Sequence, residues 1–193
     1  MSMPTLKDRM TFFASWLKSP WRTAAVQPSS QALAQLITSQ ITGVEAPVIE
    51  LGAGTGVFTY GLIKRGVPER ELVLIEGNPD FAVLLKTRFP RAQVLCMDAA
   101  DIARIDVMFD GERPGAAISG LPLLTMPRDA VMAIVGGVFA LMRDGGALFQ
   151  FTYMPYCPIP AHVLDHFGLV AHRIGCTRAN VPPAAVYRIT RHF

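Results

Sequence analysis

The run of residues from Val48 to Gly56 constrains this chain more than any other stretch. Two β-forming residues lead into Glu50, glycines occupy every second position from 52 to 56, and an apolar-periodic segment begins at Val57. This order predicts a strand, a tight turn and a helix. Glycine permits a positive φ and a close approach of the backbone to a bound molecule, and a helix start offers unpaired N–H groups and a positive dipole end. The stretch therefore predicts a nucleotide-like ligand at the carboxyl end of a first parallel strand.

The spacing of the glycines narrows the choice of ligand. The dinucleotide fingerprint G-x-G-x-x-G would need its third glycine at position 57, where the sequence has Val57. The pattern E-x-G-x-G-x-G begins at Glu50 instead, and it resembles motif I of the class I S-adenosylmethionine-dependent methyltransferases. In that family the acidic residue faces the cationic α-amino group of the methionine moiety. For an isolated loop of this kind, a tight turn without a ligand is the alternative.

Two further acidic residues follow the next two predicted strands. Glu76 comes directly after an apolar strand at 72–75, and Asp98 stands at the tip of a strand predicted at 93–97. A carboxylate at the end of the second strand suits the ribose hydroxyls of a nucleotide, and the resemblance implies that Asp98 and the N–H of Ala99 meet the adenine ring. Each carboxylate alone is more typical of a solvated strand end. The predicted cofactor-binding residues are Glu50, Gly52, Ala53, Gly54, Gly56, Glu76, Gly77, Asp98, Ala99 and Ser119.

The rest of the chain alternates between strand and helix patterns. A lead-in helix is expected from Ser29 or Ser30 to Ile41, with Gly43 as its stop. Later strands are predicted at 116–119, 147–152, 169–176 and 185–191, and later helices at 57–64, 81–89, 129–142 and 161–167. The resemblance implies an α/β fold of the Rossmann-like class I methyltransferase type. Its sheet has seven strands, mostly parallel with an antiparallel last strand, and helices on both faces.

Length and composition favour one domain that folds without disulfides or a structural metal. The chain has 193 residues, of which 51% are hydrophobic, but it contains no apolar run of the roughly 18 residues that a membrane span requires. Its three cysteines are odd in number and widely spaced, which argues against a disulfide framework or a zinc site. His162 and His166 lack an evident third ligand, so no metal is expected. A net charge of +3 does not by itself indicate a nucleic-acid partner.

The first residues of the chain form a separate unit in this interpretation. Residues 1–25 are predicted as an amphipathic helix and lead-in, followed by the methyltransferase domain at 26–193. Leu6, Met10, Phe13 and Leu17 recur at helical spacing, with basic residues largely elsewhere around the helix. Such a helix can pack on the domain or lie in an anionic membrane surface. Because no secretory signal is evident, we expect a cytoplasmic protein peripherally associated with the inner membrane.

The exit of the fourth predicted strand bears on the substrate. In methyltransferases that act on the amino group of adenine or on protein glutamine, this exit usually reads N-P-P-Y or a close variant. Here it reads Ser119-Gly120-Leu121-Pro122, with no amide and no aromatic residue. Stacking of a base on an aromatic side chain contributes roughly 1–3 kcal/mol, and its loss disfavours a nucleic-acid substrate.

Several segments resemble the small bacterial phosphatidylethanolamine N-methyltransferases, also called phospholipid N-methyltransferases. Beyond the glycine loop, the matching segments include residues 119–124, residues 150–153 and residues 180–184 before the last strand. The specific ones are Ser119-Gly120-Leu121-Pro122 and Gln150-Phe151-Thr152-Tyr153. The resemblance implies methyl transfer from S-adenosylmethionine to the ethanolamine head group of a phospholipid. The products would be phosphatidylcholine or its partly methylated precursors, with S-adenosylhomocysteine released. The alternatives are an N-methyltransferase of rRNA or another nucleic acid, a small-molecule methyltransferase, and a catalytically silent cofactor-fold protein.

The substrate site is expected beside the cofactor. Gly120, Leu121, Pro122 and Tyr153 are the predicted substrate-binding residues, and Tyr153 is the one catalytic candidate. Tyr153 could orient the amine or face the methylated cation through its ring. The alternative is an amphipathic residue of the core. No general base is assigned, because positioning and desolvation of a neutral amine supply most of such catalysis.

Overall fold

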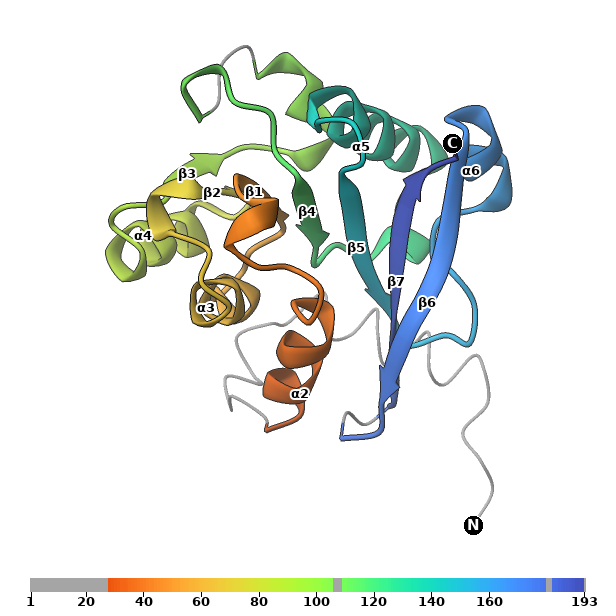
Figure 1. Cartoon of the computed structure of the whole chain (residues 1–193), viewed down its shortest axis with the longest axis horizontal. Coiled ribbons are helices and arrows are strands. Elements are labelled where there is room, and N and C mark those ends of the chain that lie inside the picture. Colours follow the sequence, from red (N-terminus) through yellow and green to blue (C-terminus); the bar gives the residue numbers. More distant parts are fainter. Residues whose placement is uncertain (1–27, 106–108, 180–181, 193) are drawn as a thin grey trace.

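The computed structural model describes residues 28–105, 109–179 and 182–192. The predicted N-terminal helix and the domain boundary at residue 25 lie outside these ranges. One sheet of seven strands crosses the described part of the chain in the order β3-β2-β1-β4-β5-β7-β6 (Figure 1). The strands are β1 (Val48–Leu51), β2 (Leu72–Glu76), β3 (Gln93–Cys96), β4 (Ala116–Ser119), β5 (Ala147–Thr152), β6 (Leu169–Thr177) and β7 (Ala184–Arg191).

The strand directions confirm the predicted topology. β1 pairs in parallel with β2 on one side and with β4 on the other, and β3 and β5 extend the parallel sheet outward. β7 pairs antiparallel with both β5 and β6, so it alone runs against the other six. From β1 the chain continues outward through β2 and β3 on one side. It then crosses to the other side of β1, where it forms β4. That reversal creates a crevice position between β1 and β4 where α/β sheets bind their ligands.

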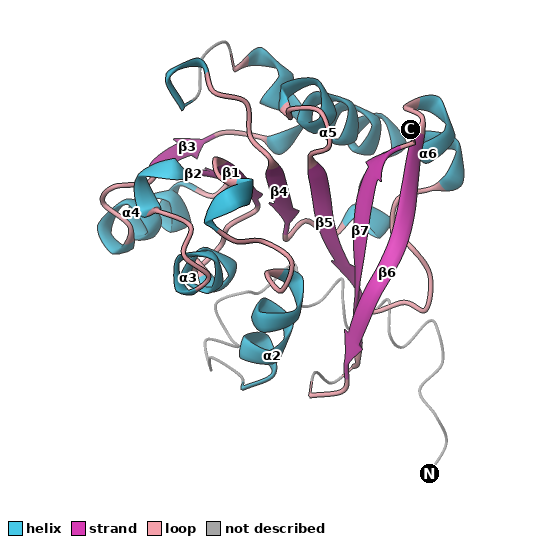
Figure 2. Cartoon of the chain, viewed as in Figure 1, coloured by secondary structure: helices cyan, strands magenta, loops and turns pink. Residues whose placement is uncertain are grey.

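Helices cover both faces of the sheet (Figure 2). On one face lie α2 (Pro28–Ile37), α3 (Val57–Lys64) and α4 (Pro79–Arg88), which share a buried apolar cluster with Val48 and Phe149. On the other face lie α5 (Arg128–Leu141) and α6 (Ala161–His166), packed with Ile49 and Leu148. Both faces of the central strands are therefore removed from water, which explains why β1, β2 and β4 read as nearly continuous apolar runs.

The helix before β1 is shorter than predicted. α2 ends at Ile37 rather than Ile41, and Gly43 begins a short 3-10 helix (Gly43–Glu45) instead of stopping α2. The Thr38 hydroxyl donates to the Ala34 carbonyl at 2.7 Å, and the N–H of Ile41 bonds three residues back to Thr38. A side chain that competes for helix carbonyls and a tightened last turn end the helix early. Ile41 is still fully buried, so its apolar character serves the core and not a helix face.

The helices of the described residues are all short. The longest, α5, has 14 residues, and no helix in those ranges combines the length and apolar character needed to cross a bilayer.

Candidate active site

The glycine loop after β1 is held in a conformation that requires glycine. Gly52, Gly54 and Gly56 have φ values of 67°, 55° and 81°, a region that other L-residues rarely adopt. A Cβ on Gly56 would also lie 2.3 Å from Cε2 of Phe89, whereas one on Gly54 would meet nothing within 4 Å. The loop is thus packed against α4 at Gly56 and open at Gly54, which leaves a backbone surface for a ligand.

Glu50 lies beneath this loop and is fully buried. Its Oε2 accepts a hydrogen bond of 2.6 Å from the hydroxyl of Thr59 on α3, while its Oε1 has no partner among the described residues. Burial raises the pKa of the Glu50 carboxyl to about 8, against the lowering effect of the Thr59 bond and with a further rise from the charge of Glu76. A buried acceptor without a donor is costly, and it suits a cationic or N–H group of a ligand.

Glu76 ends β2 and reaches across to the glycine loop. Its Oε2 accepts from the N–H of Gly54 at 2.8 Å, and its Oε1 accepts from the N–H of Asn78 at 2.8 Å. Ala53 and Gly52 donate their N–H groups to the carbonyl of Ile75 in the same strand. The structure therefore brings Glu76 and the glycines into direct contact, as the strand-end positions predict.

Asp98 and its neighbours lie one strand farther along the same edge. Asp98 is exposed, and its carboxylate accepts from the N–H of Ala100 at 2.9 Å, capping a short 3-10 helix (Ala99–Arg104). Ala99 is buried, whereas Gly77 is exposed beside Glu76. Asp98 thus shares the carboxyl edge with Glu76 through the β2–β3 pairing, but its carboxylate is turned to its own helix start.

The loop after β4 touches the glycine loop directly. Ser119 is fully buried at the end of β4, and its hydroxyl accepts from the N–H of Leu121 at 3.3 Å. A Cβ on Gly120 would lie 2.7 Å from the carbonyl oxygen of Gly52, and one on Gly52 would lie 2.7 Å from Cδ2 of Leu121. The predicted substrate loop and the predicted cofactor loop therefore form adjoining walls, with half-buried Pro122 following.

Tyr153 follows β5 and is half-buried. Its ring centroid is 5.5 Å from that of Phe151, which in turn is 5.9 Å from that of Phe58, both in edge-to-face geometry. Phe58 lies in the first turn of α3, two residues after Gly56. This row of rings connects Tyr153 to α3, the helix that follows the glycine loop. The rings lie on the same face of the sheet as Glu50.

Sequence reasoning assigned no role to three side chains that shape this region. Thr59 bonds Glu50, Arg88 donates to the carbonyl of Thr55 in the glycine loop at 2.8 Å, and Gln150 donates to the carbonyl of Leu121 at 3.0 Å. Thr59 and Gln150 are polar residues in otherwise apolar segments, which is the signal that would have identified them. For Arg88 the sequence carries no such signal, because a basic residue at a helix end is ordinary.

These residues fit an S-adenosyl nucleoside with a cationic amino acid moiety. The orphaned Oε1 of Glu50 matches an ammonium donor, the open side of Gly54 gives room for close approach, and Glu76 supplies acceptors at the same loop. Within the described ranges, no three His, Cys, Asp or Glu side chains are gathered as metal ligands.

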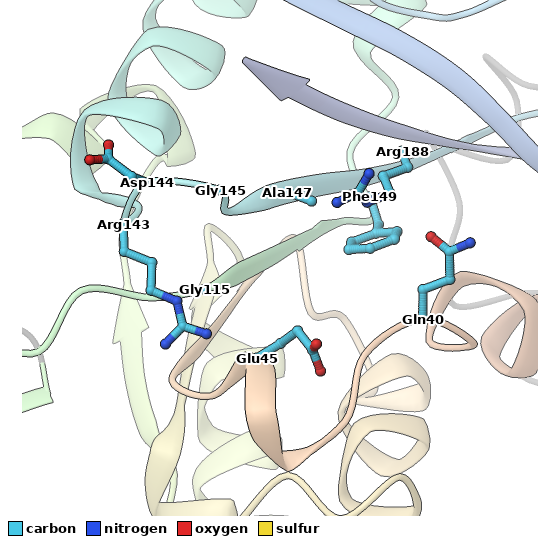
Figure 3. Close-up of a pocket in the computed structure, with 9 residues that line it drawn as sticks. All are labelled: Gln40, Glu45, Gly115, Arg143, Asp144, Gly145, Ala147, Phe149 and Arg188. Atoms are coloured by element: carbon cyan, nitrogen blue, oxygen red, sulfur yellow. The ribbon is translucent and has the colours of Figure 1, made fainter. Parts of the chain in front are cut away.

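A shallow hollow of about 240 Å³ lies at the opposite edge of the sheet, where β4 and β5 begin (Figure 3). Arg143 crosses it and donates to the carbonyl of Val44 at 2.8 Å. The guanidinium thereby ties the turn before β5 to the segment before β1. The lining residues are Gln40, Glu45, Gly115, Arg143, Asp144, Gly145, Ala147, Phe149 and Arg188.

Comparison with solved structures supports the fold. A TehB-like SAM-dependent methyltransferase from Corynebacterium glutamicum superposes with a TM-score of 0.61 at 13% identity, covering 97% of this chain and 100% of that one. A 16S rRNA methyltransferase of T. thermophilus gives a TM-score of 0.65 at 21% identity, covering 89% of this chain and 45% of that one. At these identities the likeness concerns the fold alone.

Comparison with characterised sequences goes further, although no protein-family model matches the chain. An ornithine lipid N-methyltransferase of Singulisphaera acidiphila is 30% identical over 188 residues, which cover 94% of this chain and 95% of the relative. This identity extends over nearly the whole of both chains. It agrees with the glycine loop, the acidic residues at the strand ends and the strand order described above. The chain therefore belongs to the class I S-adenosylmethionine-dependent methyltransferases, in the family of that lipid N-methyltransferase, and S-adenosylmethionine is its cofactor.

Proposed function

We propose that this methyltransferase methylates the amine of a lipid head group, with phosphatidylethanolamine as its acceptor. The observation that carries the lipid acceptor is the near full-length relationship to an ornithine lipid N-methyltransferase. Ornithine and ethanolamine head groups both present a primary amine on a short alkyl chain. The apolar loop after β4, with Leu121 and Pro122 in place of an amide and an aromatic residue, supports a flexible aliphatic amine over a planar base.

In this proposal Glu50, Glu76 and the glycine loop hold the cofactor, with Asp98 and Ala99 at the adenine end. Bound S-adenosylmethionine would supply an electrophilic methyl group on a sulfonium. Gly120, Leu121 and Pro122 form the wall that holds the amine, and Tyr153 orients it. Burial of the amine disfavours its charged form. A neutral amine would then accept the methyl group without a dedicated base. Its N–C bond would form as the S–C bond breaks, S-adenosylhomocysteine would leave, and the methylated ammonium would release its proton to water.

Methylation assays on liposomes of defined composition test the identity of the acceptor. We expect purified protein with radiolabelled S-adenosylmethionine to label phosphatidylethanolamine in liposomes, seen by thin-layer chromatography as mono-, di- or trimethylated lipid. Parallel liposomes should contain ornithine lipid instead. Label on ornithine lipid alone would reject phosphatidylethanolamine and keep a lipid amine, whereas label on neither would reject lipid methylation.

We further propose that residues 1–18 recruit the protein to anionic membranes. This segment lies outside the described residues, and the proposal rests on its spacing of apolar and basic residues. Removing residues 1–18 should weaken sedimentation with liposomes of phosphatidylethanolamine and anionic lipid, while S-adenosylmethionine affinity changes little. Replacing Lys7 and Lys18 by glutamine is the milder comparison, because it removes charge and keeps the apolar face. Unchanged sedimentation after truncation would reject the membrane role.

A further inference from the structure

Gln150 occupies a position in β5 that favours function over stability. Its side chain is 1% exposed, and its Nε2 donates both to the carbonyl of Leu121 at 3.0 Å and to the carbonyl of Phe151 at 2.9 Å. Two carbonyl partners fix which end of the amide is the nitrogen, since the reversed amide would set oxygen against oxygen. The Oε1 atom then has no partner among the described residues. A buried acceptor left unsatisfied is a cost that an aliphatic residue would avoid.

The bond from Gln150 acts on the wall between the two predicted subsites. Gln150 is in register with Ser119 of β4, so it stands beside the point where that strand ends. The carbonyl that it holds belongs to Leu121, whose side chain lies against Gly52 of the glycine loop. The Gln150 amide therefore holds the loop after β4 at Leu121, the residue that contacts the glycine loop.

Tyr187 makes the equivalent bond to the next loop. It lies in β7 in register with Gln150, and its hydroxyl donates to the carbonyl of Pro155, in the loop after β5, at 3.2 Å. Tyr187 belongs to the apolar cluster on the α5 face and is 7% exposed. Two neighbouring strand side chains thus each hold one backbone carbonyl of one loop.

We propose that Gln150 and Tyr187 are positioning residues for methyl transfer, which fix the loops after β4 and β5 so that the acceptor amine lies in line with the methyl group. The in-line geometry makes rate sensitive to small displacements of a loop, because near-attack alignment supplies much of the rate enhancement. Neither side chain touches the reacting atoms in this account. The inference rests on the proposed function for the identity of the acceptor. The effect of Gln150 and Tyr187 on the order of the two loops does not depend on that function.

The main test compares Gln150→Leu and Tyr187→Phe with the wild-type protein. We expect kcat for the methylated lipid to fall roughly tenfold in each variant, with the Kd for S-adenosylmethionine unchanged within about twofold. Thermal stability of Gln150→Leu should be unchanged or higher, because the orphaned Oε1 is removed. Thr38→Val is the matched control, since it removes another buried side-chain bond to a backbone carbonyl, at the end of α2 and in neither of the two loops, and it should retain wild-type kcat.

Gln150→Glu gives a readout that a purely structural role would not produce. When protonated, the introduced carboxyl can donate one bond to the Leu121 carbonyl, and when ionised it repels that oxygen. The ratio of variant to wild-type kcat should therefore fall as pH rises, whereas the same ratio for Gln150→Leu stays flat. Parallel pH slopes for the two variants would overturn the assignment.

Hydrogen exchange keeps the test independent of the acceptor. Backbone amides at 121–126 should exchange faster in Gln150→Leu, and those at 154–157 faster in Tyr187→Phe, with or without an active lipid substrate. Unchanged exchange in both loops would overturn the positioning role even if lipid methylation is confirmed. Faster exchange combined with no lipid methylation by the wild-type protein would instead reject the proposed acceptor and keep the positioning role.

Discussion

Raising the pH from about 5 to about 8 is expected to destabilise the cofactor-free protein, and Glu50→Gln should remove most of that dependence. Burial raises the pKa of the Glu50 carboxyl from 4.5 to about 8. Between pH 4.5 and pH 8 the folded state keeps a proton that the unfolded state releases. The contribution of Glu50 to the free energy of unfolding is therefore complete below about pH 4.5 and is lost as the pH rises toward 8. The free energy of unfolding should fall by about 3–5 kcal/mol over this range from this group.

Urea denaturation at several pH values measures this effect. The wild-type midpoint should fall between pH 5 and 8, and the Glu50→Gln midpoint should change much less, because an amide does not ionise. Glu45→Gln serves as the control. Desolvation raises the pKa of the Glu45 carboxyl, but hydrogen bonds from Thr42 and the charge of Arg143 together outweigh it and lower that pKa. The replacement should therefore leave the wild-type fall in place. Equal pH slopes for wild-type protein and Glu50→Gln would show that Glu50 is not the responsible group.

Glu76→Ala is expected to weaken binding of S-adenosylmethionine by about 1.5–3 kcal/mol, or roughly 10- to 150-fold in Kd. The Glu76 side chain is nearly buried, and its carboxyl oxygens accept hydrogen bonds from the N–H groups of Gly54 and Asn78. Its removal would take away both the proposed ribose acceptor and a bond that orders the glycine loop. Glu76→Gln should weaken binding less than Glu76→Ala, because one amide oxygen can still accept.

Isothermal titration of each variant with S-adenosylmethionine measures these affinities. Glu112→Ala removes an exposed carboxylate from the segment that precedes β4 and should bind as the wild-type protein does. Circular dichroism of Glu76→Ala should show a folded chain, which separates lost affinity from lost structure. An unchanged Kd in a folded Glu76→Ala variant would remove Glu76 from the cofactor site.

The sequence by itself determined the order of elements and the edge at which the site lies. Alternate glycines after Glu50 require a turn with positive φ, and the apolar runs that precede Glu76 and Ser119 mark strands buried on both faces. Because parallel strands end at a common edge, residues placed after successive strands must gather there. Local preference and strand direction sufficed for these features.

Only the tertiary structure decided how the side chains at that edge are partnered. Sequence reasoning directed Glu50 to a ligand, whereas folding buries it against Thr59 and leaves one oxygen unpaired. It also extended α2 to Ile41, where a bond from Thr38 ends the helix sooner. The bond from Gln150 to Leu121 joins residues 29 positions apart. Such bonds depend on the register between β4 and β5. Strands buried on both faces show apolar runs without alternation, so their hydrophobic pattern does not fix that register.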